Sequence, residues 1–128
     1  MSNRLIYLKQ ILFSQAKEIF DNIPHGNGFQ LDNNQVMQAY GYAVLGNKTK
    51  AKSLLEETTE KYPGAANSNY RYSQVYVALG DFNEALNQLE LGYVNRDVHM
   101  FWINADPAFD PIRNEPRFKA LLKKMNLD

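Results

Sequence analysis

Apolar and polar residues alternate with the period of an α-helix along most of the chain. Near the start, Leu5, Leu8, Leu12, Ala16 and Ile19 recur every three or four residues and would form one apolar stripe. Similar stripes follow, separated by short groups of Gly, Pro, Asn and Asp that favour turns. The pattern therefore predicts an all-α domain with helices at residues 3–21, 33–45, 48–61, 67–79, 82–95, 98–104 and 115–125, plus a short turn at 107–112.

One stretch of this pattern occurs twice, 34 residues apart. The segment YAVLGNKTKAKSLLE at residues 42–56 aligns with YVALGDFNEALNQLE at residues 76–90. Identical residues occupy the first position, the central Leu-Gly pair, and the Ala, Leu and Glu that follow. So many matches at a single offset indicate a duplicated helix–turn–helix unit.

The residues at the centre of each unit suit a sharp turn between two helices. Gly46 and Gly80 stand where one helix must end, and glycine takes the left-handed backbone conformation there without a steric penalty. Asn47 and Asp81 follow at once and can cap the next helix by accepting hydrogen bonds from its free N–H groups. An alanine five residues beyond each glycine leaves room for the two helices to pack closely.

These features resemble the tetratricopeptide repeat family, which has a period of 34 residues and a Gly-Asp-(aromatic)-x-x-Ala turn. Residues 80–85 match that turn, and residues 46–51 match it more loosely. The resemblance implies one domain over residues 1–128, built as an α-solenoid of antiparallel helix pairs. It divides the chain into an N-terminal helix and loop (1–31), repeats at 32–65 and 66–99, and a C-terminal cap (100–128).

The last part of the chain leaves the repeat and shows a different pattern. Asp-Pro pairs at 106–107 and 110–111 each predict a helix cap followed by proline at the first helical position. Together with the second repeat, this tail resembles the end of repeat modules in bacterial multidomain regulators, where a DNA-binding, cyclase or kinase domain precedes the repeats. The resemblance implies either a free-standing module or the C-terminal part of such a regulator. Trp102, Phe109 and Phe118 are expected to cover the apolar face of the last repeat helix.

Composition excludes several classes of protein. With 128 residues, 45% of them apolar, the chain is long enough for one domain with its own core. The formal net charge is zero, which argues against nucleic-acid binding, because phosphate neutralisation supplies most of that affinity. Cysteine is absent, so disulfides and thiolate metal sites are excluded. No apolar run approaches the roughly 18–20 residues of a membrane span, and we expect a cytoplasmic protein without a membrane partner.

Residues that could carry catalysis are few and poorly placed. His25 lies in a turn-rich loop without a nearby carboxylate, and His99 stands beside apolar residues, where a half-buried packing role is expected. Asp106 and Asp110 precede prolines, so we interpret them as helix caps and not as a general acid–base pair. The acidic run at residues 56–60 predicts a solvated helix face. We therefore expect no enzymatic activity, no metal and no cofactor.

The basic residues gather near the end of the chain, between residues 113 and 124. A basic stripe of this kind can bind nucleic acid, but it also suits a final helix whose cations lie near its negative C-terminal end. We favour the helix interpretation.

The tetratricopeptide resemblance also implies a binding surface. In that family, the ligand lies on the inner face formed by the first helix of each repeat. Mixed aromatic, amide and cationic side chains on such a face suit an extended or helical peptide. Carried over to this sequence, the inner face consists of Asn33, Val36, Met37, Tyr40, Asn67, Tyr70, Arg71 and Gln74.

Tyr40, Tyr70, Arg71 and Gln74 are the expected contact residues, and they should be exposed in the absence of a partner. The same face could instead pack against the N-terminal helix or the C-terminal tail. The family's clamp on a C-terminal carboxylate needs Lys and Asn where this chain has Val36 and Tyr40, so that mode is not expected. The sequence predicts a module that binds a protein or peptide segment. The alternative is a self-associating structural module that holds a larger protein together as a dimer.

Overall fold

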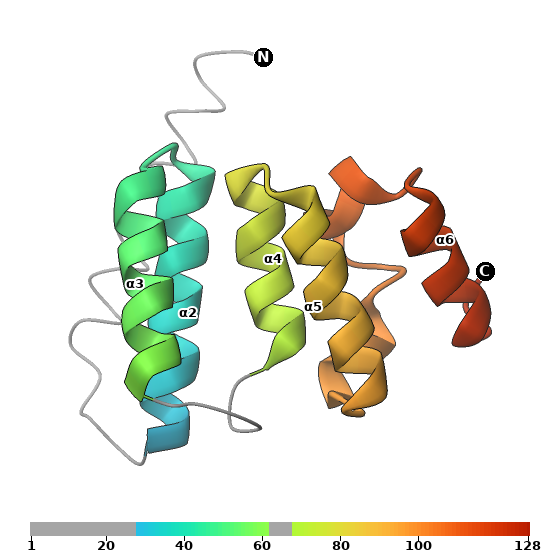
Figure 1. Cartoon of the computed structure of the whole chain (residues 1–128), viewed down its shortest axis with the longest axis horizontal. Coiled ribbons are helices and arrows are strands. Elements are labelled where there is room, and N and C mark those ends of the chain that lie inside the picture. The colour runs from blue at the N-terminus through green and yellow to red at the C-terminus, as the bar shows by residue number, and fades with distance from the viewer. Residues whose placement is uncertain (1–27, 62–67) are drawn as a thin grey trace.

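The computed structural model of the chain describes residues 28–61 and 68–128, with side chains described from residue 35 onward in the first range. Every regular element within these residues is a helix, so the predicted all-α class is confirmed for them. Figure 1 shows the helices side by side, followed by the tail. Their bounds are α2 (Gly28–Val44), α3 (Lys48–Lys61), α4 (Asn69–Leu79), α5 (Phe82–Val94), the short 3₁₀ helices η1 (Val98–Trp102) and η2 (Pro107–Ile112), and α6 (Pro116–Lys124).

The helices form two antiparallel pairs in a row. α2 packs on α3, α4 packs on α5, and α2 also packs on α4, which joins the pairs. Beyond the second pair, η2 packs on α4, while η1 and α6 pack on α5 (Figure 1). The tail therefore stands at the far end of the row, where a further helix pair would otherwise continue it.

Both predicted turns are confirmed, with the same hydrogen bonds in each. Gly46 and Gly80 have φ of +90° and +83°, in the left-handed region that favours glycine. The backbone N–H of Asn47 donates to the carbonyl of Tyr42 over 2.8 Å, and that of Asp81 donates to Tyr76 over 2.9 Å. The side chains of Asn47 and Asp81 then cap α3 and α5 by accepting from the backbone N–H groups of Lys50 and Glu84, each over 3.2 Å.

α4 is the central helix, because its opposite sides belong to two different apolar clusters. Tyr72, Val75 and Leu79 are buried against α2 and α3. Tyr70 and Val77 are buried against α5 and the tail. The stability of the two helix pairs is therefore linked through one helix of the second pair.

Some predicted boundaries differ from the observed ones. α2 begins at Gly28 and not at residue 33, because no glycine or proline interrupts residues 29–40. The helix predicted at 98–104 is a 3₁₀ helix ending at Trp102, since the chain turns again at Ala105 before the next cap. The predicted turn at 107–112 is confirmed as η2. The helix predicted at 3–21 lies outside the described residues.

The tail contributes much of the second cluster. Phe109 and Phe118 are fully buried in one cluster with Leu86 and Leu89 of α5, so their predicted covering role is confirmed. Phe109 also packs edge-on to Tyr70 of α4, with 5.2 Å between ring centroids.

The same prediction is wrong for Trp102, which remains 59% exposed. Met100 in the short η1 helix and Ile103 directly after it take the inward positions, three residues apart, and Trp102 consequently points outward.

Candidate protein-binding surfaces

The first half of the predicted inner face lies on α2. Val36 is buried in the cluster between α2, α3 and α4, so it serves packing. Met37 and Tyr40 are half-buried. Asn33 lies in α2, but its side chain is outside the described part, and Asn67 lies wholly outside it. On α2, Met37 and Tyr40 are thus the predicted inner-face residues that a partner could still contact.

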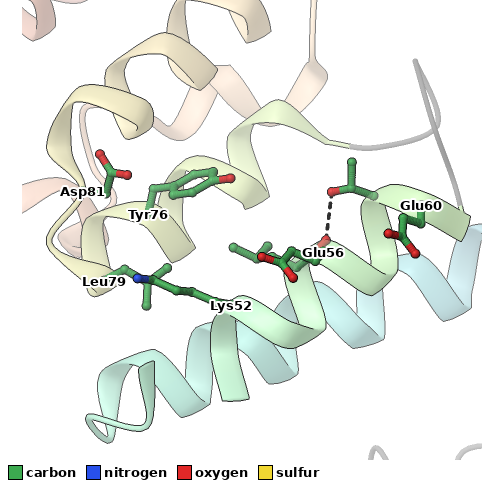
Figure 2. Close-up of a pocket in the computed structure, with 8 residues that line it drawn as sticks. Lys52, Glu56, Glu60, Tyr76, Leu79 and Asp81 are labelled. Carbon is green, nitrogen blue, oxygen red and sulfur yellow. Dashed lines mark hydrogen bonds between the residues drawn. The ribbon is translucent and has the colours of Figure 1, made fainter. Parts of the chain in front are cut away.

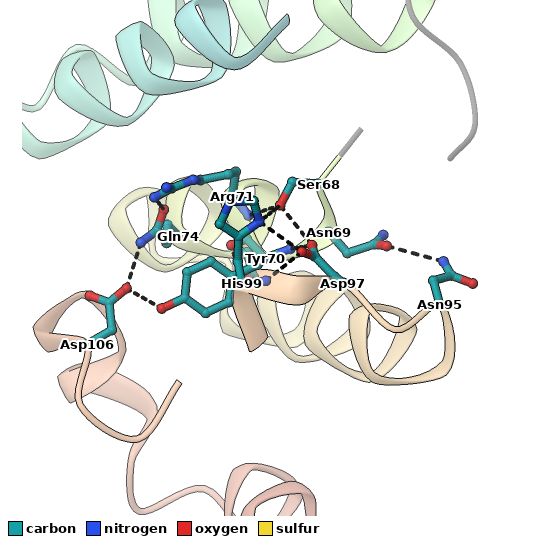
Figure 3. Close-up of polar contacts among 10 residues, drawn as sticks. Ser68, Asn69, Tyr70, Arg71, Gln74, Asn95, Asp97, His99 and Asp106 are labelled. Atoms are coloured by element: carbon teal, nitrogen blue, oxygen red, sulfur yellow. Dashed lines mark hydrogen bonds and ion pairs between the residues drawn. The ribbon is translucent and has the colours of Figure 1, made fainter. Parts of the chain in front are cut away.

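The second half of that face, on α4, is closed by the tail (Figure 3). Tyr70 is only 2% exposed and Gln74 only 7% exposed. The Tyr70 hydroxyl and the Gln74 amide both donate to the carboxylate of Asp106, the second over 2.7 Å. The prediction that Tyr70 and Gln74 are exposed contact residues is therefore wrong, because Asp106 brings the tail onto them.

A second carboxylate, Asp97, fixes the start of α4 to the tail (Figure 3). It accepts hydrogen bonds from the Ser68 hydroxyl over 2.8 Å and from the Tyr70 backbone N–H over 3.0 Å. It also accepts from the backbone of His99, and its carboxylate lies 2.9 Å from Nδ1 of that residue. The His99 ring is half-buried and stacks on Tyr70 at 6.0 Å, which confirms its predicted packing role.

The hydrogen bonds to Asp97 stabilise the charged form of its carboxyl group in the folded state. Burial by itself would raise the pKa of Asp97, but the bonds from Tyr70, Ser68 and His99 outweigh it, so the pKa of this carboxyl is lowered. A carboxyl with a lowered pKa in the folded state contributes stability above its unfolded-state pKa and loses that contribution as pH falls.

We therefore expect stability to fall as pH is lowered below about 4, the ordinary carboxyl range. Urea denaturation of the wild type and of Asp97→Asn at a series of pH values measures this. The variant should be less stable at pH 7 and should show a shallower loss toward pH 3. Equal slopes for the two proteins would rule out Asp97 as a source of the acid sensitivity.

Tyr40 and Arg71 remain accessible at the open end of the inner face. The Arg71 guanidinium donates to Gln74 Oε1 over 3.3 Å and lies 6.0 Å from the centre of the Tyr70 ring. Burial and the charge of Asp106 raise the pKa of Tyr40. The accessible part of the inner face is therefore smaller than the predicted groove. The negative charge of Asp106 disfavours the acidic ligands that Arg71 alone would attract.

The segment from the end of α5 through η1 carries most of the large apolar side chains that are exposed among the described residues. It includes Val98, Phe101 and Trp102, which are 80%, 69% and 59% exposed. The rings of Phe101 and Trp102 pack edge-on, 4.9 Å apart. We call the exposed apolar side chains of η1, Val98, Phe101 and Trp102, the C-terminal apolar patch.

The side chains of this patch are large, apolar and exposed. Large apolar side chains exposed together on a folded protein usually mark an interaction site. Two of its three members, Phe101 and Trp102, are aromatic and remain largely exposed. Trp102 was expected to cover the last repeat helix, but the register of the 3₁₀ helix turns its side chain outward.

A groove lies on the other side of the row, between α3 and the turn from α4 to α5 (Figure 2). Its volume is about 500 Å³. We call it the outer groove. It is lined by Lys52, Leu55, Glu56, Thr59, Glu60, Tyr76, Leu79 and Asp81.

The other candidate groups take structural roles. Asp106 caps η2 as predicted, accepting from Ala108 over 2.9 Å, whereas Asp110 lies within η2 and pairs with Arg113 instead of capping. Lys123 and Lys124 occupy the last turn of α6, as the basic cluster predicted. Among the residues described, no group of three His, Cys, Asp or Glu side chains could hold a metal ion. His25 lies outside them.

No described helix is both long and apolar enough to cross a membrane. Comparisons with known proteins do not assign the chain to a family. No protein-family model matches the chain, and neither a curated protein nor a solved structure matches it.

Proposed function

We propose that this chain is a tetratricopeptide-type module that binds another protein, and that the partner docks on the C-terminal apolar patch. The helical-repeat part of the proposal is supported by two helix pairs whose turns share the same glycine conformation, the same helix-ending hydrogen bond and the same cap, 34 residues apart. A repeat array gives rigid, extended surfaces, which suits protein binding better than catalysis.

The exposure of Val98, Phe101 and Trp102 is the observation that carries the docking site. Each aromatic side chain leaves roughly 100–150 Å² in water, and burying that area would contribute roughly 3 kcal/mol per ring. Tryptophan is also among the residue types that most often dominate binding energy at protein interfaces. The inner face is a weaker candidate, because Tyr70 and Gln74 are already buried by the tail.

Partner binding tests this proposal directly. Protein fragments selected from a display library on the wild-type chain provide partners whose affinity can be measured by calorimetry. Trp102→Ala should weaken binding of a selected partner by about 2 kcal/mol, roughly 30-fold, because the variant removes the largest exposed ring.

The matched control is Val44→Ala, which shortens an exposed apolar side chain at the end of α2, away from the patch. Its affinity should equal that of the wild type, and both variants should melt like the wild type. Unchanged affinity in Trp102→Ala, or an equal loss in Val44→Ala, would argue against the patch as the docking site.

The exposed apolar side chains of the patch support a second candidate, self-association. Interfaces between identical subunits are more apolar than those between proteins that also exist apart. Light scattering over a range of concentrations distinguishes the two candidates. A self-associating chain should change from monomer to dimer with concentration, and Trp102→Ala should remain a monomer. A monomer at every concentration would leave a different protein as the partner.

A further inference from the structure

The outer groove is built from one stripe of α3 facing the α4–α5 turn. Lys52, Leu55, Glu56, Thr59 and Glu60 recur every three or four residues, so they lie along one side of that helix. Tyr76, Leu79 and Asp81 form the opposite side, as Figure 2 shows. The groove therefore runs along α3 for about two helical turns.

The groove has an apolar floor and charged edges. Leu55 and Leu79 are buried beneath it, and the half-buried ring of Tyr76 stands between the two sides. The hydroxyl of Thr59 already donates to the Leu55 carbonyl over 2.8 Å, so it needs no ligand. Glu56 and Glu60 are exposed along the α3 edge, one helical turn apart.

The charge in the groove is negative and unbalanced. The lining has the carboxylates of Glu56, Glu60 and Asp81 against the single ammonium of Lys52. Within residues 28–61 and 68–128, none of these three carboxylates forms an ion pair. By contrast, Glu57, on the same helix but outside the groove, pairs with Lys61 over 3.0 Å.

The Tyr76 hydroxyl lies within reach of this negative potential. Burial raises the pKa of Tyr76, and the charges of Glu84, Asp81 and Glu56 raise it further. Carboxylates from α3 and from the start of α5 thus act on one point in the groove. A cation at that point would be attracted by these charges and could stand against the face of the tyrosine ring.

We propose that the outer groove binds a helical segment of another protein that carries two arginine or lysine side chains one turn apart. The methylene stems of such side chains would lie on Leu55 and Leu79 while their charged ends reach Glu56 and Glu60. The spacing of the two glutamates matches residues i and i+4 of the bound helix. This site is separate from the C-terminal apolar patch and does not depend on the function proposed for that patch.

A pair of synthetic alanine-based helical peptides tests the site. One carries arginines at positions i and i+4, and the other carries glutamines there. NMR titration of the wild-type chain should show saturable shifts at Leu55, Tyr76 and Leu79 with the arginine peptide, and none at Phe101 or Trp102. Binding should weaken severalfold as salt rises from roughly 50 to 200 mM, because partly exposed charges are screened.

The double variant Glu56→Gln/Glu60→Gln should weaken binding of the arginine peptide roughly tenfold, while the control Glu57→Gln should bind as the wild type does. Glutamine preserves the size and the exposure of each side chain, and matching melting temperatures would show that all the variants fold. The proposal is overturned if the arginine peptide does not bind, if the glutamine peptide binds equally well, or if Glu57→Gln weakens binding as much as the double variant.

Discussion

A chain truncated after His99 should fail to fold cooperatively. The truncation removes most of the large side chains that cover α5 and the second side of α4, among them Met100, Ile103, Phe109 and Phe118. Losing one buried phenylalanine alone typically costs about 3–5 kcal/mol, and a domain of this size is usually stable by about 5–15 kcal/mol. Circular dichroism during thermal and urea denaturation should show a broad transition or none.

The single substitution Phe118→Ala separates the packing contribution from the effect of shortening the chain. Phe118 is fully buried, with its ring centroid 6.1 Å from that of Phe109. The variant should retain a cooperative transition, with its free energy of unfolding lowered by about 3–5 kcal/mol. A truncated chain that stays soluble and melts as sharply as the wild type would show that the tail is not part of the core.

Asp106→Ala should be the most destabilising polar substitution considered for this protein, at about 2–4 kcal/mol. The change removes the acceptor for the Tyr70 hydroxyl and the Gln74 amide, both of which are buried, and it removes the cap of η2. A buried donor without a partner loses its hydration without compensation, which is why the effect exceeds that of an exposed hydrogen bond. Urea denaturation at neutral pH measures it.

Two further variants identify which hydrogen bonds of Asp106 cause this loss of stability. Asp110→Ala removes a carboxylate that is 64% exposed and pairs only with Arg113 within the described residues, so it should cost less than about 1 kcal/mol. Asp106→Asn keeps one oxygen for the η2 cap but places an amide N–H₂ where the two buried donors need an acceptor. If Asp106→Asn were as stable as the wild type, the bonds to Tyr70 and Gln74 would contribute little.

The turns could be predicted from the sequence because their requirements are local. Each turn needs a glycine in the left-handed conformation followed directly by a capping side chain, as in Gly46-Asn47 and Gly80-Asp81. Residues adjacent in sequence are sufficient to form this geometry. The same holds for the Asp-Pro pair that begins η2. The 34-residue repeat further predicts that the two turns are alike, and both copies have the same geometry.

The closure of the inner face depends on contacts between residues distant in sequence. Asp106 accepts hydrogen bonds from Gln74 and Tyr70, which lie 32 and 36 residues away in the sequence. No local sequence pattern indicates that the Asp106 carboxylate accepts further hydrogen bonds besides the one that caps η2. The predicted alternative, in which the tail packs on this face, holds for the α4 half. Trp102 was misplaced for a related reason, because its direction depends on the few residues that wind as a 3₁₀ helix.

The acidic run on α3 was interpreted as a solvated face, and Glu57 fits that interpretation. Glu56 and Glu60 lie on the same exposed helix, yet their stripe also faces the α4–α5 turn across the outer groove. The helical period alone places these glutamates on one side of α3. It does not tell which neighbouring element stands opposite, because that depends on how the two helix pairs pack.

The fluorescence of Trp102 tests the central claim most directly, because this residue is the only tryptophan in the chain and belongs to the C-terminal apolar patch. At low concentration and without a partner, its emission should resemble that of tryptophan in water and be quenched readily by acrylamide. Adding a partner selected for binding should shift the emission to shorter wavelength and reduce quenching, with saturation at the affinity measured by calorimetry. If the chain self-associates, raising its own concentration should have the same effect. Emission that stays unchanged while a partner binds, or a Trp102 that is already protected in the dilute monomer, would contradict the claim that this patch is the docking surface.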